Sequence, residues 1–112
     1  MNTQEFNQAV TEWVLACQEI INAHYRTSYP NLTIPTLEVQ EGSRYIRIFR
    51  KDGSTSRSAY AFINKGDKDG KGQGDILKPA TYKAPAKHAR GNLGDANKGL
   101  GSMSSYGPAY LR

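Results

Sequence analysis

This 112-residue sequence has few of the residues that thiol, redox or metal chemistry needs. It contains one cysteine, Cys17, and two histidines, His24 and His88. A single cysteine excludes an internal disulfide and a cysteine-based zinc cluster, and it favours a reducing compartment such as a cytosol. No Ser/His/Asp set stands at a recognisable spacing, and histidines and carboxylates do not cluster as metal ligands do. We therefore expect no catalytic residues, no cofactor and no metal, and a protein that is not an enzyme.

Long apolar runs are also missing. No stretch of 18 apolar residues occurs, so we expect no transmembrane helix and no membrane partner. The chain starts with MNTQEF, which lacks the basic and apolar regions of a secretory signal. The length is that of one domain with a modest core.

One loop contains acidic residues and glycines without forming a recognisable ion site. Asp67, Asp69 and Gly70 resemble the start of a calcium loop, but Lys78 stands where the pattern requires a glutamate. The glycines are not followed by the Gly-Lys-Ser/Thr sequence of a phosphate-binding loop. We interpret residues 65–74 as a hairpin loop.

The positive charge is unevenly distributed. Fifteen lysines and arginines against ten acids give a net charge of +5. Residues 78–112 contain six basic side chains and a single acid, Asp95, so this segment alone accounts for 6 − 1 = +5. A basic segment with interspersed tyrosines and leucines favours an anionic partner.

The N-terminal region predicts one long amphipathic helix over residues 4–27. Asn2 and Glu5 form a capping-box pattern, and Pro30 ends the helix. Apolar residues recur every three or four positions, as one buried helix face requires. They are Phe6, Val10, Trp13, Val14, Cys17, Ile20, Ile21, His24 and Tyr25.

Short alternating segments then predict strands at 36–40, 44–50 and 57–63, and a fourth starting at 75–77. Asp52-Gly53 is a hairpin signal. The expected fold class is α+β: one long N-terminal helix packed on a 3–4-stranded antiparallel β-meander (residues 1–79), with an ordered irregular C-terminal arm (residues 80–112) docking on the same domain. The face toward the helix comprises Leu37, Val39, Ile46, Ile48, Ala59, Ala61 and Ile63.

The opposite face of the sheet allows two interpretations. It would present Tyr45, Arg47, Phe49, Tyr60 and Phe62. Aromatic side chains on a sheet with basic neighbours are typical of platforms on which nucleic-acid bases stack. Alternatively, the arm covers this face as a second small core. The covering residues would be Tyr82, Leu93, Leu100 and Met103.

A basic turn in the arm is the strongest candidate site. It contains Lys83, Lys87, His88 and Arg90. Pro85 and a left-handed Gly91 predict a short helix with Lys87 and Arg90 on one side, able to hold a phosphate or carboxylate. The alternative is a turn that pairs with acids of the first domain or is solvated. Beyond it, Gly107-Pro108, Tyr110 and Leu111 predict an ordered, docked terminus.

Three segments resemble a group of small proteins encoded by tailed bacteriophages: GDILKPA at 74–80, APAKHARGN at 84–92 and YGPAYLR at 106–112. The helix and the strands at 44–48 and 58–63 are similar too. This chain has extra residues at 65–74 and 94–104. The resemblance implies an origin and a location, the cytoplasm of an infected bacterial host, and no activity.

These observations favour a non-enzymatic accessory protein of phage type that binds an anionic partner, with nucleic acid as the leading candidate. The expected contacts are Lys83, Lys87, His88, Arg90, Arg47, Tyr45 and Phe49, with Arg50 and Arg57 extending the basic track. Two alternatives remain open. One is a host-takeover or anti-defence inhibitor that binds a bacterial protein, and the other is a minor structural or self-assembling phage protein that forms homo-oligomers.

Overall fold

The N-terminal helix forms as predicted. In the computed structural model, which describes residues 1–53, 56–67 and 69–108, helix α1 spans Thr3–Ser28. Its first turn is closed by the capping box, because the Asn2 side chain accepts from the Glu5 amide at 2.8 Å and the Glu5 carboxylate accepts from the Asn2 amide at 3.1 Å. One face of the helix is buried. Its buried side chains are Phe6, Val10, Trp13, Cys17, Ile21 and Tyr25.

The sheet contains more strands than expected. Five antiparallel strands follow the chain in the order β1-β2-β3-β4-β5. They are β1 (Thr36–Glu41), β2 (Tyr45–Asp52), β3 (Ser56–Asn64), β4 (Asp75–Pro79) and β5 (Pro85–Asn92). A separate hairpin pairs β6 (Met103–Ser104) with β7 (Gly107–Pro108). The α+β class is therefore confirmed, whereas the expected count of three or four strands is wrong.

Residues 85–92 form strand β5 rather than the predicted short helix. Asp75 of β4 lies opposite Asn92, and Leu77 lies opposite Ala89. An isolated helix of this length would form few internal hydrogen bonds, whereas pairing with β4 satisfies the backbone of both strands. Pro85 stands at the first position of the strand, where a residue without an N–H is tolerated. Residues 85–92 thus belong to the sheet, and residues 80–84 form the turn that joins them to β4.

A bulge changes which side chains face α1. Ile48 pairs with Ala61 and Phe49 pairs with Ala59, which leaves Tyr60 without a partner across the ladder. The extra residue shifts the alternation of β3. Tyr60 consequently packs beside Trp13 in the core under α1, with ring centroids 6.4 Å apart. The prediction that Tyr60 lies on the opposite face with Phe62 is therefore wrong, because Ala59 rather than Tyr60 shares that face with Phe49.

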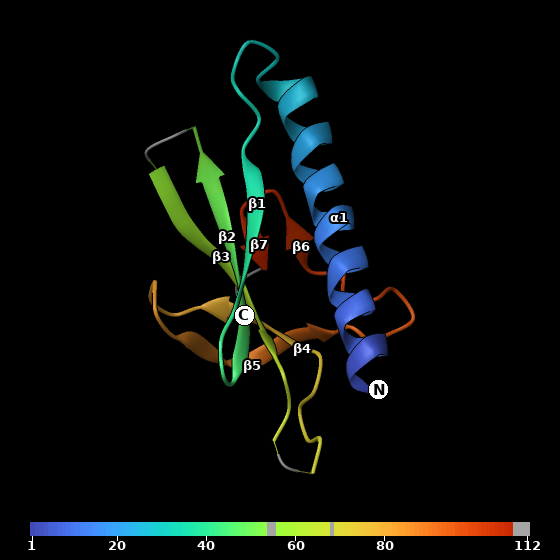
Figure 1. Cartoon of the computed structure of the whole chain (residues 1–112). Coiled ribbons are helices and arrows are strands. Elements are labelled where there is room, and N and C mark those ends of the chain that lie inside the picture. The colour runs from blue at the N-terminus through green and yellow to red at the C-terminus, as the bar shows by residue number, and fades with distance from the viewer. Residues whose placement is uncertain (54–55, 68, 109–112) are drawn as a thin grey trace.

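The face opposite α1 is covered by the β4–β5 hairpin. Figure 1 shows α1 along one side of the sheet and β4 and β5 crossing the lower parts of β2 and β3 at a steep angle. Tyr82, at the tip of this hairpin, lies on Phe49 with ring centroids 5.4 Å apart. Of the residues predicted to cover this face, Tyr82 does so. Leu93, Leu100 and Met103 instead join the core beneath α1.

The segment that ends with β7 docks on the helix-facing side of the sheet. Arg50 is only 8% exposed, and its guanidinium donates to the carbonyl of Ser105 at 2.9 Å and to the Tyr25 hydroxyl at 2.5 Å. Lys78 donates to the carbonyl of Pro108 at 3.0 Å. These hydrogen bonds hold the segment that ends with β7 against the domain as far as Pro108. Tyr110 and Leu111, for which burial was predicted, lie outside the described residues.

Candidate functional site

A hollow of about 390 Å³ lies between the start of β2 and the tip of the β4–β5 hairpin. We call it the basic groove. One wall is the β1–β2 turn with the first residues of β2, and the other wall is the hairpin tip. The lining residues are Gly42, Ser43, Arg44, Tyr45, Arg47, Lys83, Ala84 and Pro85.

The hairpin tip, residues 80–84, is shaped by its own hydrogen bonds. The Thr81 hydroxyl accepts from the amides of Lys83 at 3.2 Å and Ala84 at 3.0 Å, so a short polar side chain closes the turn. Tyr82 fixes the tip on Phe49. The Arg47 guanidinium donates to the carbonyl of Lys83 at 3.4 Å, which joins two residues that are 36 positions apart in the sequence.

The other wall is braced by Lys65. The Gly42 amide donates to the carbonyl of Tyr45 at 2.9 Å and closes the β1–β2 turn. The Lys65 ammonium group donates to the carbonyl of Gly42 at 3.1 Å and pairs with Glu41 at 3.2 Å, and the Lys65 amide donates to the carbonyl of Arg44 at 3.0 Å. Both walls of the basic groove are therefore held by residues outside its lining.

The basic groove has cations but no carboxylate among its lining residues. Two other cations of the sheet share a carboxylate partner: Glu38 lies 3.4 Å from Lys51 and 3.8 Å from Arg57. Within the described residues, Arg44, Arg47 and Lys83 form no ion pair, and no carboxylate lines the groove. Three like charges that line one concave surface create a positive potential that attracts anions.

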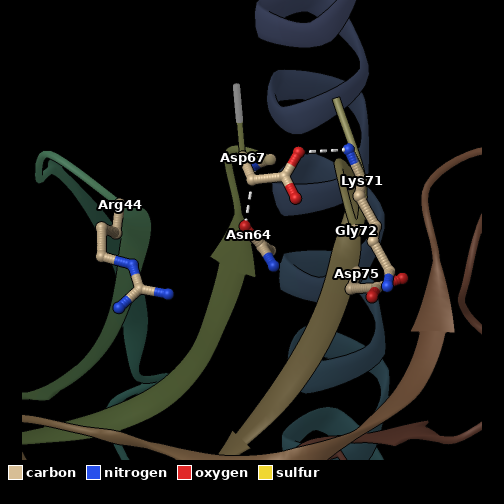
Figure 2. A pocket seen from close by; sticks show the side chains of 7 residues that line it. Arg44, Asn64, Asp67, Lys71, Gly72 and Asp75 are labelled. Carbon is tan, nitrogen blue, oxygen red and sulfur yellow. Dashed lines mark hydrogen bonds between the residues drawn. The ribbon is translucent and has the colours of Figure 1, made fainter. Parts of the chain in front are cut away.

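A larger hollow of about 650 Å³ shares Arg44 with the basic groove but has mixed charge. Figure 2 shows Arg44 on one segment, facing Asp67, Lys71 and Asp75 across the hollow. Both carboxylates that line it already accept hydrogen bonds from other residues. Asp67 accepts from the amides of Asp69 at 2.9 Å and Lys71 at 2.8 Å, and Asp75 accepts from the Asn92 side chain at 2.8 Å. We therefore take the smaller basic groove as the candidate site.

The structure brings together three of the seven predicted contact residues. Tyr45 and Arg47 enter the basic groove from β2, and Lys83 enters it from the hairpin tip. Phe49 does not line the groove. It is 1% exposed, because Tyr82 covers it and the Arg57 guanidinium lies 3.7 Å from its ring centroid. A base cannot stack on Phe49 in this arrangement, so the prediction of an aromatic platform is wrong for this residue.

The other three predicted contacts lie along β5, beyond the groove lining. Lys87 and His88 are exposed, two and three residues after Pro85 in the groove wall. Arg90 is half-buried, and its guanidinium donates to the carbonyl of His88. Lys87 and Arg90 do not form the predicted pair on one side of a helix, because this segment is a strand.

Sequence reasoning missed Arg44. It lies at the start of β2, and its guanidinium is 5.6 Å from the centroid of the Tyr45 ring. The available signal was its place beside Tyr45 and Arg47 at the start of a predicted strand. Alternation along the strand placed Arg44 on the face opposite those two residues. In the structure, Arg44 nevertheless lines the same groove as Tyr45 and Arg47.

Cys17 and His24, whose side-chain types are common in catalysis, lie outside the basic groove. Burial raises the pKa of the Cys17 thiol to about 12, so the thiol stays protonated at neutral pH. His24 makes edge contacts with the rings of Tyr25, Tyr29 and Tyr106. In the described part of the chain, no three His, Cys, Asp or Glu side chains come together as a metal site. No helix among the described residues has both the length and the apolar content to cross a bilayer.

Comparison with protein families gives a match over almost the whole chain. The model of a family of unknown function, DUF7717, matches residues 1–107, which is nearly the whole chain and includes both walls of the basic groove. No curated protein and no solved structure matches the chain. On the extent of the family match, this chain belongs to the DUF7717 family of unknown function.

Proposed function

We propose that this protein is a non-enzymatic accessory protein that binds an anionic partner, nucleic acid, in the basic groove. The observation that carries the proposal is the meeting of Arg44, Arg47 and Lys83, from two distant segments, in one groove without a carboxylate. An isolated surface cation is ordinary and needs no function. Three cations that line one groove without a carboxylate are less typical of an ordinary surface and favour the binding of an anion.

The electrostatics favour phosphate as the bound group. Like charges held near one another repel, so the unliganded groove slightly destabilises the fold, and an anion relieves that repulsion. Arginine presents a planar set of donors that matches the oxygens of a phosphate, and two of the three cations are arginines. Each wall of the groove supplies at least one cation, so one bound anion can contact both walls.

Further positive charge lies beside the groove. Lys87 and His88 are exposed on β5, which continues directly from the groove wall at Pro85. A strand advances by about 3.3 Å per residue, which places Lys87 within about 7 Å of Pro85. A chain of phosphates is longer than the groove, and β5 leads away from the groove with Lys87 two residues beyond its wall. The resemblance to phage proteins agrees with an accessory role in an infected bacterial cytoplasm.

A protein partner is the second candidate, and an observation at β1 favours it. Val39 was expected under α1, yet it is 52% exposed. A small hollow of about 250 Å³ lies between the first turns of α1 and β1. Because β1 is an edge strand of the sheet, it can pair with a strand of another chain. Such a partner would be a bacterial protein or a second copy of this chain.

Binding to DNA and RNA across a salt series tests the proposal. We expect affinity for nucleic acid at low salt that falls as salt rises. The triple variant Arg44→Gln, Arg47→Gln, Lys83→Gln should lose this binding. A matched triple variant, Arg26→Gln, Lys51→Gln, Lys98→Gln, removes the same charge outside the groove and should retain most of the binding.

Two outcomes would contradict the proposal: no binding at low salt, or equal losses in the two triple variants. Capture of a protein from bacterial lysate that survives nuclease treatment, together with the first outcome, would favour the second candidate. Light scattering of the purified protein would separate a bacterial partner from self-association.

A further inference from the structure

We infer that the basic groove takes single-stranded nucleic acid in preference to duplex, with one base stacked against Tyr45. This inference rests on the proposed function and specifies its ligand. It depends on how Tyr45 is held and on the shape of the groove around it.

Tyr45 is an aromatic side chain fixed in position. Its ring meets the ring of Phe62 edge to face, with centroids 6.0 Å apart and an interplanar angle of 85°. Phe62 is itself fully buried, and the Arg47 guanidinium lies 6.0 Å from its centroid. The half-buried Tyr45 ring is thus supported from the core while it lines the groove. A ring already held in place loses little conformational freedom when a base stacks on it.

Cations flank this ring. The Arg44 guanidinium lies 5.6 Å from the Tyr45 centroid, and Arg47 is two positions along the same strand. Residues two apart on a strand share a face, so Tyr45 and Arg47 enter the groove together. Lys83 faces them from the other wall. An aromatic ring between cations is the combination with which proteins bind single strands, where bases stack on rings and phosphates contact the cations.

The groove should bind single strands more tightly than duplex, because only an unpaired base can stack on Tyr45. In a duplex each base is already stacked on its neighbours, so Tyr45 gains a base only if that base is extruded. A duplex can therefore use the cations without using Tyr45. The groove, of about 390 Å³ and bounded by two walls, is hollowed on the scale of a small-molecule site. Stacking one base on an aromatic ring raises affinity by about 5- to 150-fold, which sets the size of the expected preference.

Anisotropy titrations of the full chain with a labelled ten-nucleotide single strand and with its duplex test the inference. We expect the single strand to bind at least about fivefold more tightly at low salt. Tyr45→Phe should keep this preference because it keeps the ring. Tyr45→Leu keeps an apolar side chain against Phe62 but removes the aromatic face, so it should weaken single-strand binding about 5- to 150-fold and duplex binding hardly at all.

The salt dependence of binding distinguishes the contribution of stacking on Tyr45 from that of the phosphate contacts. Loss of one phosphate contact lowers the slope of log K against log salt by about 0.7 for a single strand. Lys83→Gln should lower the slope by this amount, whereas Tyr45→Leu should leave it unchanged. Thermal melting of each variant shows whether it is folded.

The outcomes distinguish the inference from the proposal on which it rests. Duplex binding equal to single-strand binding, or full single-strand affinity in folded Tyr45→Leu, overturns the inference and leaves the proposed function standing. Absence of binding to both forms at low salt overturns both. A stacking loss in Tyr45→Leu with retention in Tyr45→Phe supports the inference.

Discussion

The two faces of the sheet are covered in different ways. On one face, α1 buries a continuous apolar stripe against β2, β3 and the segment that ends with β7. On the other face, the tip of a hairpin places Tyr82 on Phe49, and guanidinium groups lie over the rings of Phe49 and Phe62. The first cover is apolar and extensive, whereas the second is small and cationic.

This difference predicts that one face mainly determines stability and the other mainly determines binding. A face closed by many apolar contacts opens only when the protein unfolds, whereas a face closed by few contacts opens locally at lower free energy. The cations of the basic groove lie at the edge of the second cover. We therefore expect substitutions under α1 to change stability, and substitutions around the groove to change binding.

Truncation of Trp13 should have the largest effect. Trp13 is 1% exposed beneath α1, so Trp13→Ala should lower the free energy of unfolding by about 3–5 kcal/mol. Its indole N–H is buried without a hydrogen-bond partner among the described residues. Trp13→Phe removes that unpaired donor and should be less costly, below about 1.5 kcal/mol. Urea unfolding measures both, and equal losses would contradict this account.

Replacement of Gly107 tests the docking of β7 on the same face. Gly107 has φ of 105°, and an added Cβ would lie 2.6 Å from the carbonyl oxygen of Tyr60. Gly107→Ala should lower the free energy of unfolding by about 2–3 kcal/mol. Gly53→Ala is the control, because Gly53 has φ of 72° but open space around it, and it should cost about 1 kcal/mol. A loss no larger than that of the control would show that the close approach to Tyr60 is unimportant.

Truncation of Tyr82 tests the weaker cover directly. Tyr82 packs on Phe49 while remaining partly exposed, so Tyr82→Ala should cost only about 1 kcal/mol. The same change should weaken nucleic-acid binding, because Tyr82 positions the tip that carries Lys83. Thermal melting and anisotropy measure the two effects. A stability loss comparable with that of Trp13→Ala would show that the two covers contribute equally to the stability of the fold.

Removal of one groove cation should have the smallest effect on stability. Arg44→Gln should leave the free energy of unfolding within about 0.5 kcal/mol of the wild-type value, because it relieves repulsion and breaks no ion pair. It should nevertheless weaken binding of a single-stranded oligonucleotide about tenfold, as loss of a charged hydrogen bond does. Arg26→Gln, on the exposed face of α1, should change neither quantity. Equal binding by the two variants would argue against a role for Arg44.

Local signals explain what could be predicted. The helix was recognised because its spacing, its capping box and Pro30 all lie within one segment, and its bounds were right to within one residue at each end. The first strands alternate and were located correctly. Strand β5 was not, since the segment from Pro85 to Asn92 lacks apolar alternation and becomes a strand by pairing with β4.

The candidate site was only partly predictable for the same reason. The charge excess of residues 78–112 drew attention to Lys83, and strand alternation placed Tyr45 and Arg47 on one face. The bulge that turns Tyr60 toward α1 depends on pairing between β2 and β3, which has no signature within either strand alone. The burial of Phe49 depends on Tyr82, which is far away in the sequence.

The sequence by itself determined the helix, the first strands, the α+β class and the total charge, because each of these follows from residues that are neighbours in the chain. Only the tertiary structure decided that β5 is a strand, that Phe49 is covered, and that Arg44, Arg47 and Lys83 meet without a carboxylate. The physical reason is that these features depend on contacts between distant segments, whose free energy appears only after the chain has folded.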